Sequence, residues 1–291
     1  PAFWAQFPGN FQYIARKAVI SSKNFAGFTS LHNYPSGRPE GNHWGPAISV
    51  FETTSQTAYY YNHHVRDIGN FTVVGPTGSG KTVFLSFIAA QTQRVQPRPK
   101  LLFVDKDRGA EIFIRALGGQ YETLVPGEPT GFNPLSLPDS APNREFLYQL
   151  FAFMLRPANG ADLTASEEQV IRNAIAAALT GGPAGRTLKA FSTLLRGRIR
   201  AGEGDLLARL ESWMRPDQRG WLFNNEEDQF SLSSVFGFDM TRVLDDPVIR
   251  TAALMYIFHR TEELLTGDPV MIFLDEGWRL LDDDVFAFFI R

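Results

Sequence analysis

The segment 75–82 constrains the fold of this chain more than any other. Its residues, Gly-Pro-Thr-Gly-Ser-Gly-Lys-Thr, match the pattern G-x-x-x-x-G-K-[ST] at every fixed position. Glycines in this pattern let the backbone turn successive N–H groups inward around phosphate oxygens. A short apolar run, 71–74, precedes the segment, and residues 83–92 have helical character. A strand, a glycine-rich turn and a helix in this order predict a phosphate-binding loop in a parallel α/β domain.

We expect this loop to bind ATP with Mg²⁺. Lys81 would reach the β- and γ-phosphates and take part in catalysis, and the Thr82 hydroxyl would ligate Mg²⁺. The positive end of the helix dipole would also face the anion. The alternative is a glycine-rich turn that binds no ligand. The predicted nucleotide-binding residues are Gly75, Pro76, Thr77, Gly78, Ser79, Gly80, Lys81, Thr82 and Val83.

A second segment, 270–276, reads Val-Met-Ile-Phe-Leu-Asp-Glu. Its apolar residues predict a strand buried on both faces, and the two carboxylates follow at the strand end where parallel sheets bind ligands. We expect Asp275 to hold the Mg²⁺ shell and Glu276 to act as general base for the attacking water. An ordinary acidic turn is the alternative, and the pairing with Lys81 favours the catalytic interpretation.

Residues 1–70 are rich in Gly, Pro, Asn and aromatic residues and show few helical periodicities. We predict an extended linker that ends in a small β-element with strands at 47–53 and 57–62. His63 and His64 follow these strands, and we interpret them as surface or packing residues because no metal-ligand spacing surrounds them.

Helical periodicity dominates residues 140–229, which separate two parts of a P-loop NTPase core, 71–139 and 230–291. Thr164 followed by Glu167 is a capping-box pattern. The fold class is therefore α/β, with a mostly parallel sheet and an inserted helical subdomain. In the insertion we predict helices at 143–155, 164–179, 188–200 and 205–214. In the core we predict strands at 101–104, 230–238 and 270–274, and helices at 110–117 and 247–265.

Charge is distributed without a basic excess. The formal net charge is −3, so a nucleic-acid partner is possible but not favoured. The chain contains no cysteine, which excludes disulfides, thiolate zinc sites and cysteine nucleophiles. No apolar run approaches the length of about 18 residues that a membrane-spanning helix needs.

Three further groups allow two interpretations each. The charged segment 105–108 either contributes to a nucleotide or subunit interface or caps the helix 110–117, and we favour the cap. The aromatic residues within 146–153 suit core packing better than base stacking. The local basic concentration either contacts a substrate, lipid or phosphate or is a solvated helix face, which we favour. Its members are Arg186, Arg196, Arg198 and Arg200.

With these residues placed, the chain resembles the C-terminal ATPase domain of the VirB-four/TrbE/CagE family of conjugation and type IV secretion proteins. The resemblance covers nearly the whole chain. Its most specific segments are Asn-Pro-Leu at 133–135 and Asp-Glu-x-Trp-x-Leu-Leu at 275–281. Other matching segments are Pro-Gly-Asn at 8–10, Trp-Gly-Pro at 44–46, residues 67–70 and 105–111, Gly-Gly at 118–119 and Phe-Asp-Met-Thr at 238–241.

The resemblance implies a RecA-like core. In this family, further strands, a polar sensor and a trans-acting arginine follow the strand that carries Asp275, and we expect them to be absent from the residues up to 291. It also implies a homo-oligomer in the form of a hexameric ring. This ring would be cytoplasmic and peripheral on the inner membrane of a bacterium, where other secretion-system subunits would be its partners. The leading function is a Mg-ATP-hydrolysing motor for substrate transfer or pilus assembly. A DNA-pumping ATPase of the coupling-protein or FtsK type and a nucleotide-stabilised structural subunit are the alternatives. Intact Asp275 and Glu276 argue against the structural subunit.

Overall fold

The computed structural model describes residues 3–14, 19–28, 34–157, 160–182, 185–195, 206–230, 233–263, 265 and 267–277. It divides into two compact units, Pro1–Ile68 and Gly69–Arg291, and each is treated by itself. The first unit contains the 3₁₀ turns η1 (Trp4–Gln6) and η2 (Phe11–Tyr13), the helix α1 (Ser22–Phe28), and the strands β1 (Ser49–Glu52) and β2 (Ala58–Tyr61).

Strands β1 and β2 form an antiparallel pair with Ser49 opposite Tyr61, which confirms the predicted small β-element. The Thr53 N–H donates to Thr57 O at 2.8 Å and closes the turn between them. His63 is buried beside the Trp44 ring, as predicted for a packing residue. Burial is also the main reason that the pKa of His63 falls to about 4.

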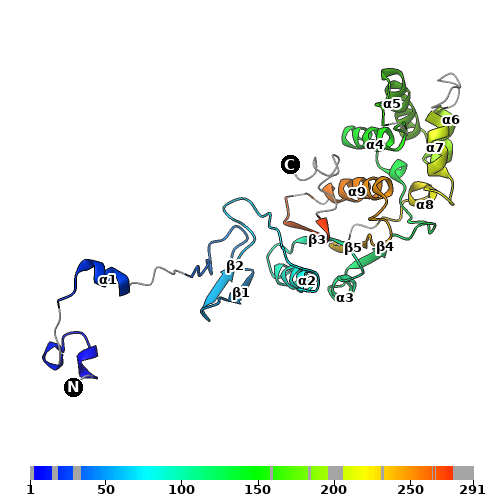
Figure 1. The fold of residues 1–291 in the computed structure, drawn as a ribbon. Coiled ribbons are helices and arrows are strands. Elements are labelled where there is room, and N and C mark those ends of the chain that lie inside the picture. Colours follow the sequence, from blue (N-terminus) through cyan, green and yellow to red (C-terminus); the bar gives the residue numbers. More distant parts are fainter. Residues whose placement is uncertain are drawn as a thin grey trace. The chain divides into compact units, whose positions relative to one another are not determined.

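A parallel four-stranded sheet forms the centre of the second unit, in the order β4-β5-β3-β6. The fold class is therefore α/β, as predicted. Helices α2 and α3 cover one face of the sheet, and α9 covers the other (Figure 1). The elements are α2 (Lys81–Thr92), β3 (Lys100–Asp105), α3 (Glu111–Ala116), β4 (Gln120–Thr123), β5 (Val235–Asp239), α9 (Pro247–Glu262) and β6 (Val270–Leu274).

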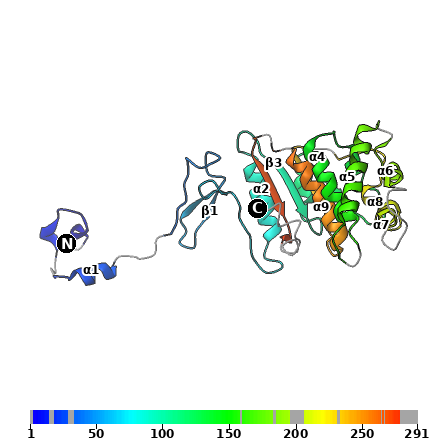
Figure 2. The same cartoon turned by 90° about the horizontal axis from the view of Figure 1, so that it is seen from above.

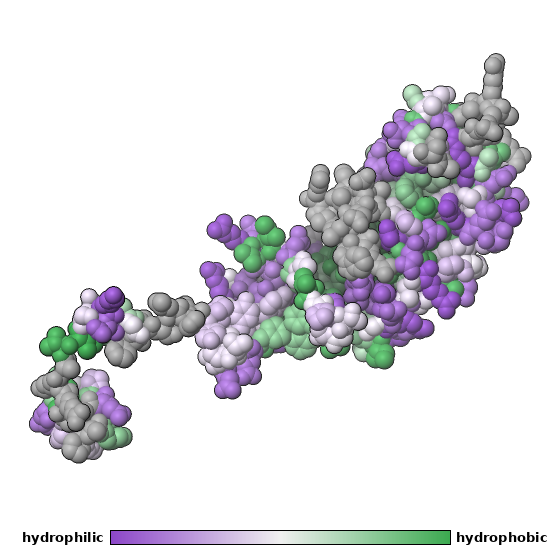
Figure 3. Space-filling model, in the orientation of Figure 1, coloured by the Kyte–Doolittle hydropathy of each residue, from purple (hydrophilic) through white to green (hydrophobic). Residues whose placement is uncertain are grey.

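The helices between β4 and β5 pack on the outer side of α9, so the layers follow one another from α2 through the sheet and α9 to α5 (Figure 2). They are η3 (Pro134–Ser136), α4 (Ala141–Met154), α5 (Ala165–Thr180), α6 (Leu188–Leu195), α7 (Leu206–Met214) and α8 (Gly220–Phe223). The predicted capping box at the start of α5 is confirmed by reciprocal bonds between Thr164 and Glu167. Most of the visible surface over α5 to α7 is hydrophilic (Figure 3).

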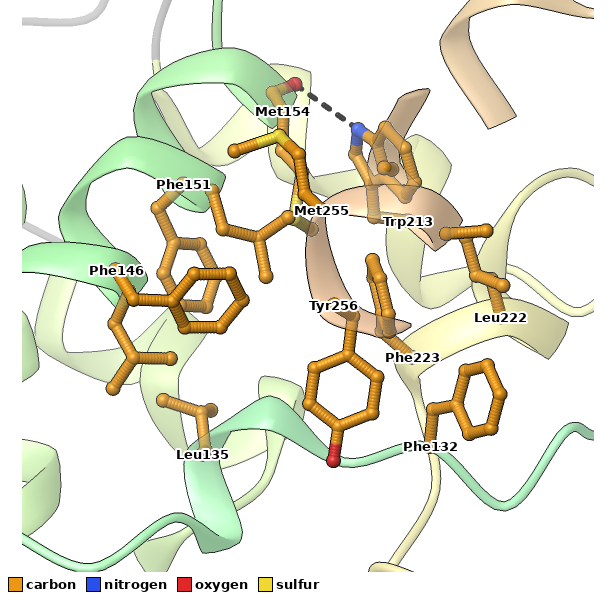
Figure 4. Close-up of a cluster of buried hydrophobic side chains, with 14 of the residues drawn as sticks. Phe132, Leu135, Phe146, Phe151, Met154, Trp213, Leu222, Phe223, Met255 and Tyr256 are labelled. Atoms are coloured by element: carbon orange, nitrogen blue, oxygen red, sulfur yellow. Dashed lines mark hydrogen bonds between the residues drawn. The ribbon is translucent and has the colours of Figure 1, made fainter. Parts of the chain in front are cut away.

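One apolar core joins the sheet to these helices. Leu102 and Phe236 lie opposite each other on β3 and β5 and belong to this core, together with Phe151 of α4. The aromatic residues of α4 therefore pack inside the protein, as predicted. Trp213 is fully buried, and its indole N–H donates to Met154 O at 3.0 Å, so the polar atom of the largest core side chain has a partner (Figure 4).

Three predictions for the core strands were wrong. Residues 71–74 form no strand: the Phe71 ring packs edge-on against the Phe273 ring, whereas Val74 is 89% exposed. Strand β6 is not buried on both faces, since it lies at the edge of the described sheet and Ile272 remains 45% exposed. The strand predicted at 230–238 begins only at Val235.

The other predicted elements agree with the structure to within a few residues. The helices predicted at 188–200 and 247–265 are assigned over Leu188–Leu195 and Pro247–Glu262. Arg196, Arg198 and Arg200 lie outside the described residues. Arg186 lies inside them, and its guanidinium donates to backbone carbonyls of Leu137 and Leu179.

Candidate functional site

The predicted phosphate-binding loop leads directly into α2, which begins at Lys81. Gly78 and Gly80 have φ values of 78° and 86°, a left-handed conformation that glycine adopts without steric cost. Residues 76–80 are exposed, so the loop presents its backbone to solvent at the start of the helix. The N–H groups of the first helical turn have no partner within the helix, and this end attracts anions.

Lys81 lies folded over the loop. Its ammonium donates to Gly75 O at 3.0 Å and to Pro76 O at 3.2 Å. Gly75 also approaches Ser79 closely, since a Cβ added to Gly75 would lie 2.6 Å from Ser79 Oγ. The ammonium therefore has the loop's own carbonyl oxygens as partners, at the position where phosphate oxygens would compete for it.

Thr82 and Asp275 meet, although they are far apart in the sequence. The Thr82 hydroxyl donates to Asp275 Oδ2 at 3.1 Å. Asp275 directly follows β6, and its N–H donates to Val104 O at 2.8 Å, which continues the ladder with β3. The sheet thus holds the carboxylate beside the first turn of α2.

Glu276 comes next, at φ 54°, a left-handed conformation that non-glycine residues adopt uncommonly. Its N–H donates to Asp275 Oδ1 at 3.1 Å, so the turn is built around the Asp275 carboxylate. The Glu276 side chain is half-buried at the same sheet edge. Val83, by contrast, is 74% exposed on α2.

Three aspartates end three neighbouring strands at this edge. Asp105 and Asp239 are register partners at the ends of β3 and β5, and Asp275 follows β6 beside them. Asp105 is only 1% exposed and accepts hydrogen bonds from the N–H groups of Lys106 and Ala110. Burial raises the pKa of Asp105 above its ordinary value, and these hydrogen bonds partly oppose the rise.

Within the charged segment 105–108, Asp105 binds the Ala110 N–H before α3, in keeping with the cap interpretation, and the structure does not test a nucleotide or subunit interface. Asp105 is an internal anchor that was not expected to be buried, whereas Asp107 and Arg108 border a cavity of about 400 Å³. Asp107 N–H donates to Thr241 Oγ1 at 2.6 Å, which ties the loop after β3 to the end of β5. The cavity is lined by Asp107, Arg108, Thr123, Val125, Asp239, Thr241 and Arg242.

Comparison with known proteins extends over the whole chain. It is 40% identical over 291 residues to the type IV secretion system protein VirB4 of Bartonella henselae, covering 100% of this chain and 36% of that protein. It is 40% identical over 312 residues to PtlC of Bordetella pertussis, covering 99% of this chain and 37% of that protein. The chain belongs to the VirB4 family.

The chain therefore spans just over a third of the length of these VirB4-family relatives. No family model matches it. Among solved structures, VirB4 of Thermoanaerobacter pseudethanolicus has a similar fold, with a TM-score of 0.63 at 17% identity, over 81% of this chain and 69% of that chain. This likeness concerns the fold alone.

The Asn-Pro-Leu segment that carried the resemblance to the VirB4 family has a structural role. Asn133 is buried, and its side-chain amide donates to Arg186 O at 2.9 Å and to Glu226 O at 3.2 Å. Its Oδ1 accepts the Leu135 N–H at 3.1 Å and caps η3. The segment therefore joins the chain after β4 to the helical insertion. The other specific segment is described only to residue 277, and residues 278–281 lie beyond it.

Sequence reasoning missed Gly109, Tyr121 and Asp239 at this edge. Asp239 was visible only as part of a segment shared with the VirB4 family. Tyr121 gave no signal, because it reaches the site from β4 across β5. In the described part of the chain, no three His, Cys, Asp or Glu side chains gather as a metal cluster, and no helix could cross a membrane.

Proposed function

We propose that this chain is the ATP-binding part of a P-loop ATPase that powers a type IV secretion system. One observation carries the proposal: Thr82 Oγ1 and Asp275 Oδ2 lie 3.1 Å apart. Adjacent oxygens in an octahedral Mg²⁺ shell lie about 2.9 Å apart, so the two groups suit one cation. The names of the VirB4-family relatives support the secretion role.

The loop also fits a triphosphate. A Cβ placed on Gly78 or on Gly80 would have no atom of the described residues within 4 Å, so the loop is open at these two positions. Backbone N–H groups at the start of α2 would bind phosphate oxygens, and Lys81 would exchange Gly75 O and Pro76 O for them. Mg²⁺, held by Thr82 and Asp275, would neutralise charge on the β- and γ-phosphates.

For hydrolysis, Glu276 would orient a water molecule and accept its proton as the γ-phosphoryl group is transferred. Lys81 would stabilise the negative charge that develops on the leaving phosphates. The proposal also includes a ring of identical copies, a hexamer, with other secretion-system subunits at the bacterial inner membrane. Light scattering of the purified complete protein, with and without nucleotide, tests the ring.

The decisive experiment measures ATP binding and phosphate release by the complete protein, with Mg²⁺ and with excess EDTA. We expect Mg²⁺-dependent binding and turnover. Binding without turnover in the assembled state would favour a structural subunit that nucleotide stabilises. Stimulation by DNA with a steep salt dependence would favour a DNA-pumping motor. Absence of nucleotide binding would reject the proposal.

A further inference from the structure

The loop after β3 is held tightly at both ends. Asp105 accepts the Lys106 N–H on Oδ1 at 2.9 Å and the Ala110 N–H on Oδ2 at 2.8 Å. Tyr121 Oη donates to the same Oδ2 at 2.5 Å. Together with the bond from Asp107 to Thr241, these contacts fix the path of the backbone through Gly109.

This fixed backbone passes directly over Thr82. A Cβ added to Gly109 would lie 2.9 Å from the Thr82 methyl carbon, closer than real Cβ atoms approach their neighbours. The same Cβ would keep 3.7 Å from Asp105 Oδ1 and from Lys106 O, which is ordinary contact. The Thr82 methyl is therefore the group that an alanine at this position would displace.

The position of that methyl group determines the position of the hydroxyl. Both are attached to the same Cβ of Thr82, so χ1 rotation moves them together, and the staggered rotamers lie about 120° apart. In the present rotamer the hydroxyl donates to Asp275 Oδ2 at 3.1 Å. A rotation that freed the methyl from an alanine at residue 109 would turn the hydroxyl away from Asp275.

We propose that Gly109 is a positioning residue: because it has no Cβ, it leaves room for the Thr82 methyl and so permits the rotamer that keeps the Thr82 hydroxyl on the cation side of the loop. The inference rests on the proposed Mg-ATP site. It assigns to Gly109 a steric role in Mg²⁺-dependent nucleotide binding. The phosphate-binding N–H groups of the loop lie outside this contact, so binding of the nucleotide without Mg²⁺ does not depend on it.

The test measures the affinity of a fluorescent ATP analogue for the complete protein, with Mg²⁺ and with excess EDTA. Gly109→Ala should weaken binding with Mg²⁺ by about tenfold, the usual effect of losing an orienting contact at a metal site. Binding in EDTA should stay within about twofold of wild type. Gly182→Ala is the matched control, because a Cβ there would meet no atom within 4 Å.

Rescue distinguishes the methyl contact from a general structural effect. Thr82→Ser keeps the hydroxyl and removes the methyl, so Thr82→Ser/Gly109→Ala should bind with Mg²⁺ as Thr82→Ser does. If Gly109→Ala alone fails to fold, a folded double variant supports the contact and an unfolded one overturns it. The inference about Gly109 is overturned if Gly109→Ala binds with unchanged Mg²⁺ dependence, or if the double variant is impaired as much as Gly109→Ala. Neither result would affect the proposed function. A wild-type protein that binds no nucleotide overturns the proposed function as well.

Discussion

Tyr121 donates a hydrogen bond to Asp105 at 2.5 Å although the strand β5 lies between their strands. Gly237 makes this possible, because a Cβ at that position on β5 would lie 2.7 Å from Tyr121 Cδ2. The phenol therefore crosses the sheet over a residue without a side chain. It reaches the buried Asp105 carboxylate, which holds the loop next to the candidate magnesium site.

Tyr121→Phe tests this contact. The variant leaves the buried Asp105 carboxylate without one of its donors, and we expect the free energy of unfolding to fall by about 1–3 kcal/mol. Urea denaturation followed by circular dichroism measures the change. Tyr13→Phe, which alters an exposed ring, is the control and should have little effect. Equal stability of the two variants would show that the bond to Asp105 contributes nothing.

Lys81→Ala should abolish nucleotide binding by the complete protein. The ammonium is the positive charge placed over the loop, and among the described residues its partners are carbonyl oxygens of the loop. Titration with a fluorescent ATP analogue measures the loss. Lys189→Ala removes an exposed lysine of α6 and should bind normally. Retained binding by the Lys81 variant would contradict the assignment of the loop.

Glu276→Gln should keep nucleotide binding and lose turnover, by at least about 100-fold, because the amide cannot accept a proton from water. Phosphate release and ATP-analogue binding are measured on the same preparation. Glu211→Gln, at an exposed position of α7, should hydrolyse normally. Hydrolysis at the wild-type rate by Glu276→Gln would assign the general base to another group.

Asn133→Ala should destabilise the fold without changing nucleotide affinity. The substitution leaves the carbonyl groups of Arg186 and Glu226 and the Leu135 N–H without this partner. The Leu135 N–H is the buried one of the three, and a buried donor left unpaired costs about 1–3 kcal/mol. Thermal unfolding and nucleotide titration separate the two effects. Asn173→Ala is a suitable control on the exposed side of α5. A selective loss of nucleotide binding would give Asn133 a functional role instead.

His259 on α9 makes stability depend on pH. Burial lowers its pKa from 6.5 to about 4, and its Nε2 lies 2.7 Å from Asn143 Oδ1. Since the unfolded chain binds the proton more tightly, stability is complete above about pH 6.5 and is lost as pH falls towards 4, at about 1.4 kcal/mol per unit. His259→Gln should lose less stability than wild type over this range, as measured by urea denaturation. Parallel pH profiles for the two proteins would rule out His259.

The parts of the site that local pattern encodes were predictable from the sequence. The motif around Lys81 marks the start of a helix, and the apolar run before Asp275 marks a strand and its end. In a parallel sheet, such strand ends and helix starts lie at one edge. Thr164 and Glu167 likewise encode a helix start through a local hydrogen-bond exchange. These signals depend on neighbours in sequence, so no tertiary information was needed.

The remaining parts depend on contacts between distant segments. The sequence around Tyr121 does not predict that its hydroxyl reaches Asp105 two strands away, because the space for the ring is left by Gly237 on a third strand. The apolar run 71–74 resembles a strand, yet a strand also needs a hydrogen-bonding partner, which sequence composition does not specify. The fit of Gly109 against Thr82 is a matter of tenths of an ångström between a loop and the first turn of α2.

The helical insertion has a consequence for how the chain folds. Strands β4 and β5 are neighbours in the sheet, but the whole of α4 to α8 lies between them in the sequence. Closing so long a loop costs chain entropy, whereas the contacts within the helices are local and form early. We therefore expect the helices to fold before the sheet, so that the edge bearing the three aspartates is completed last during refolding.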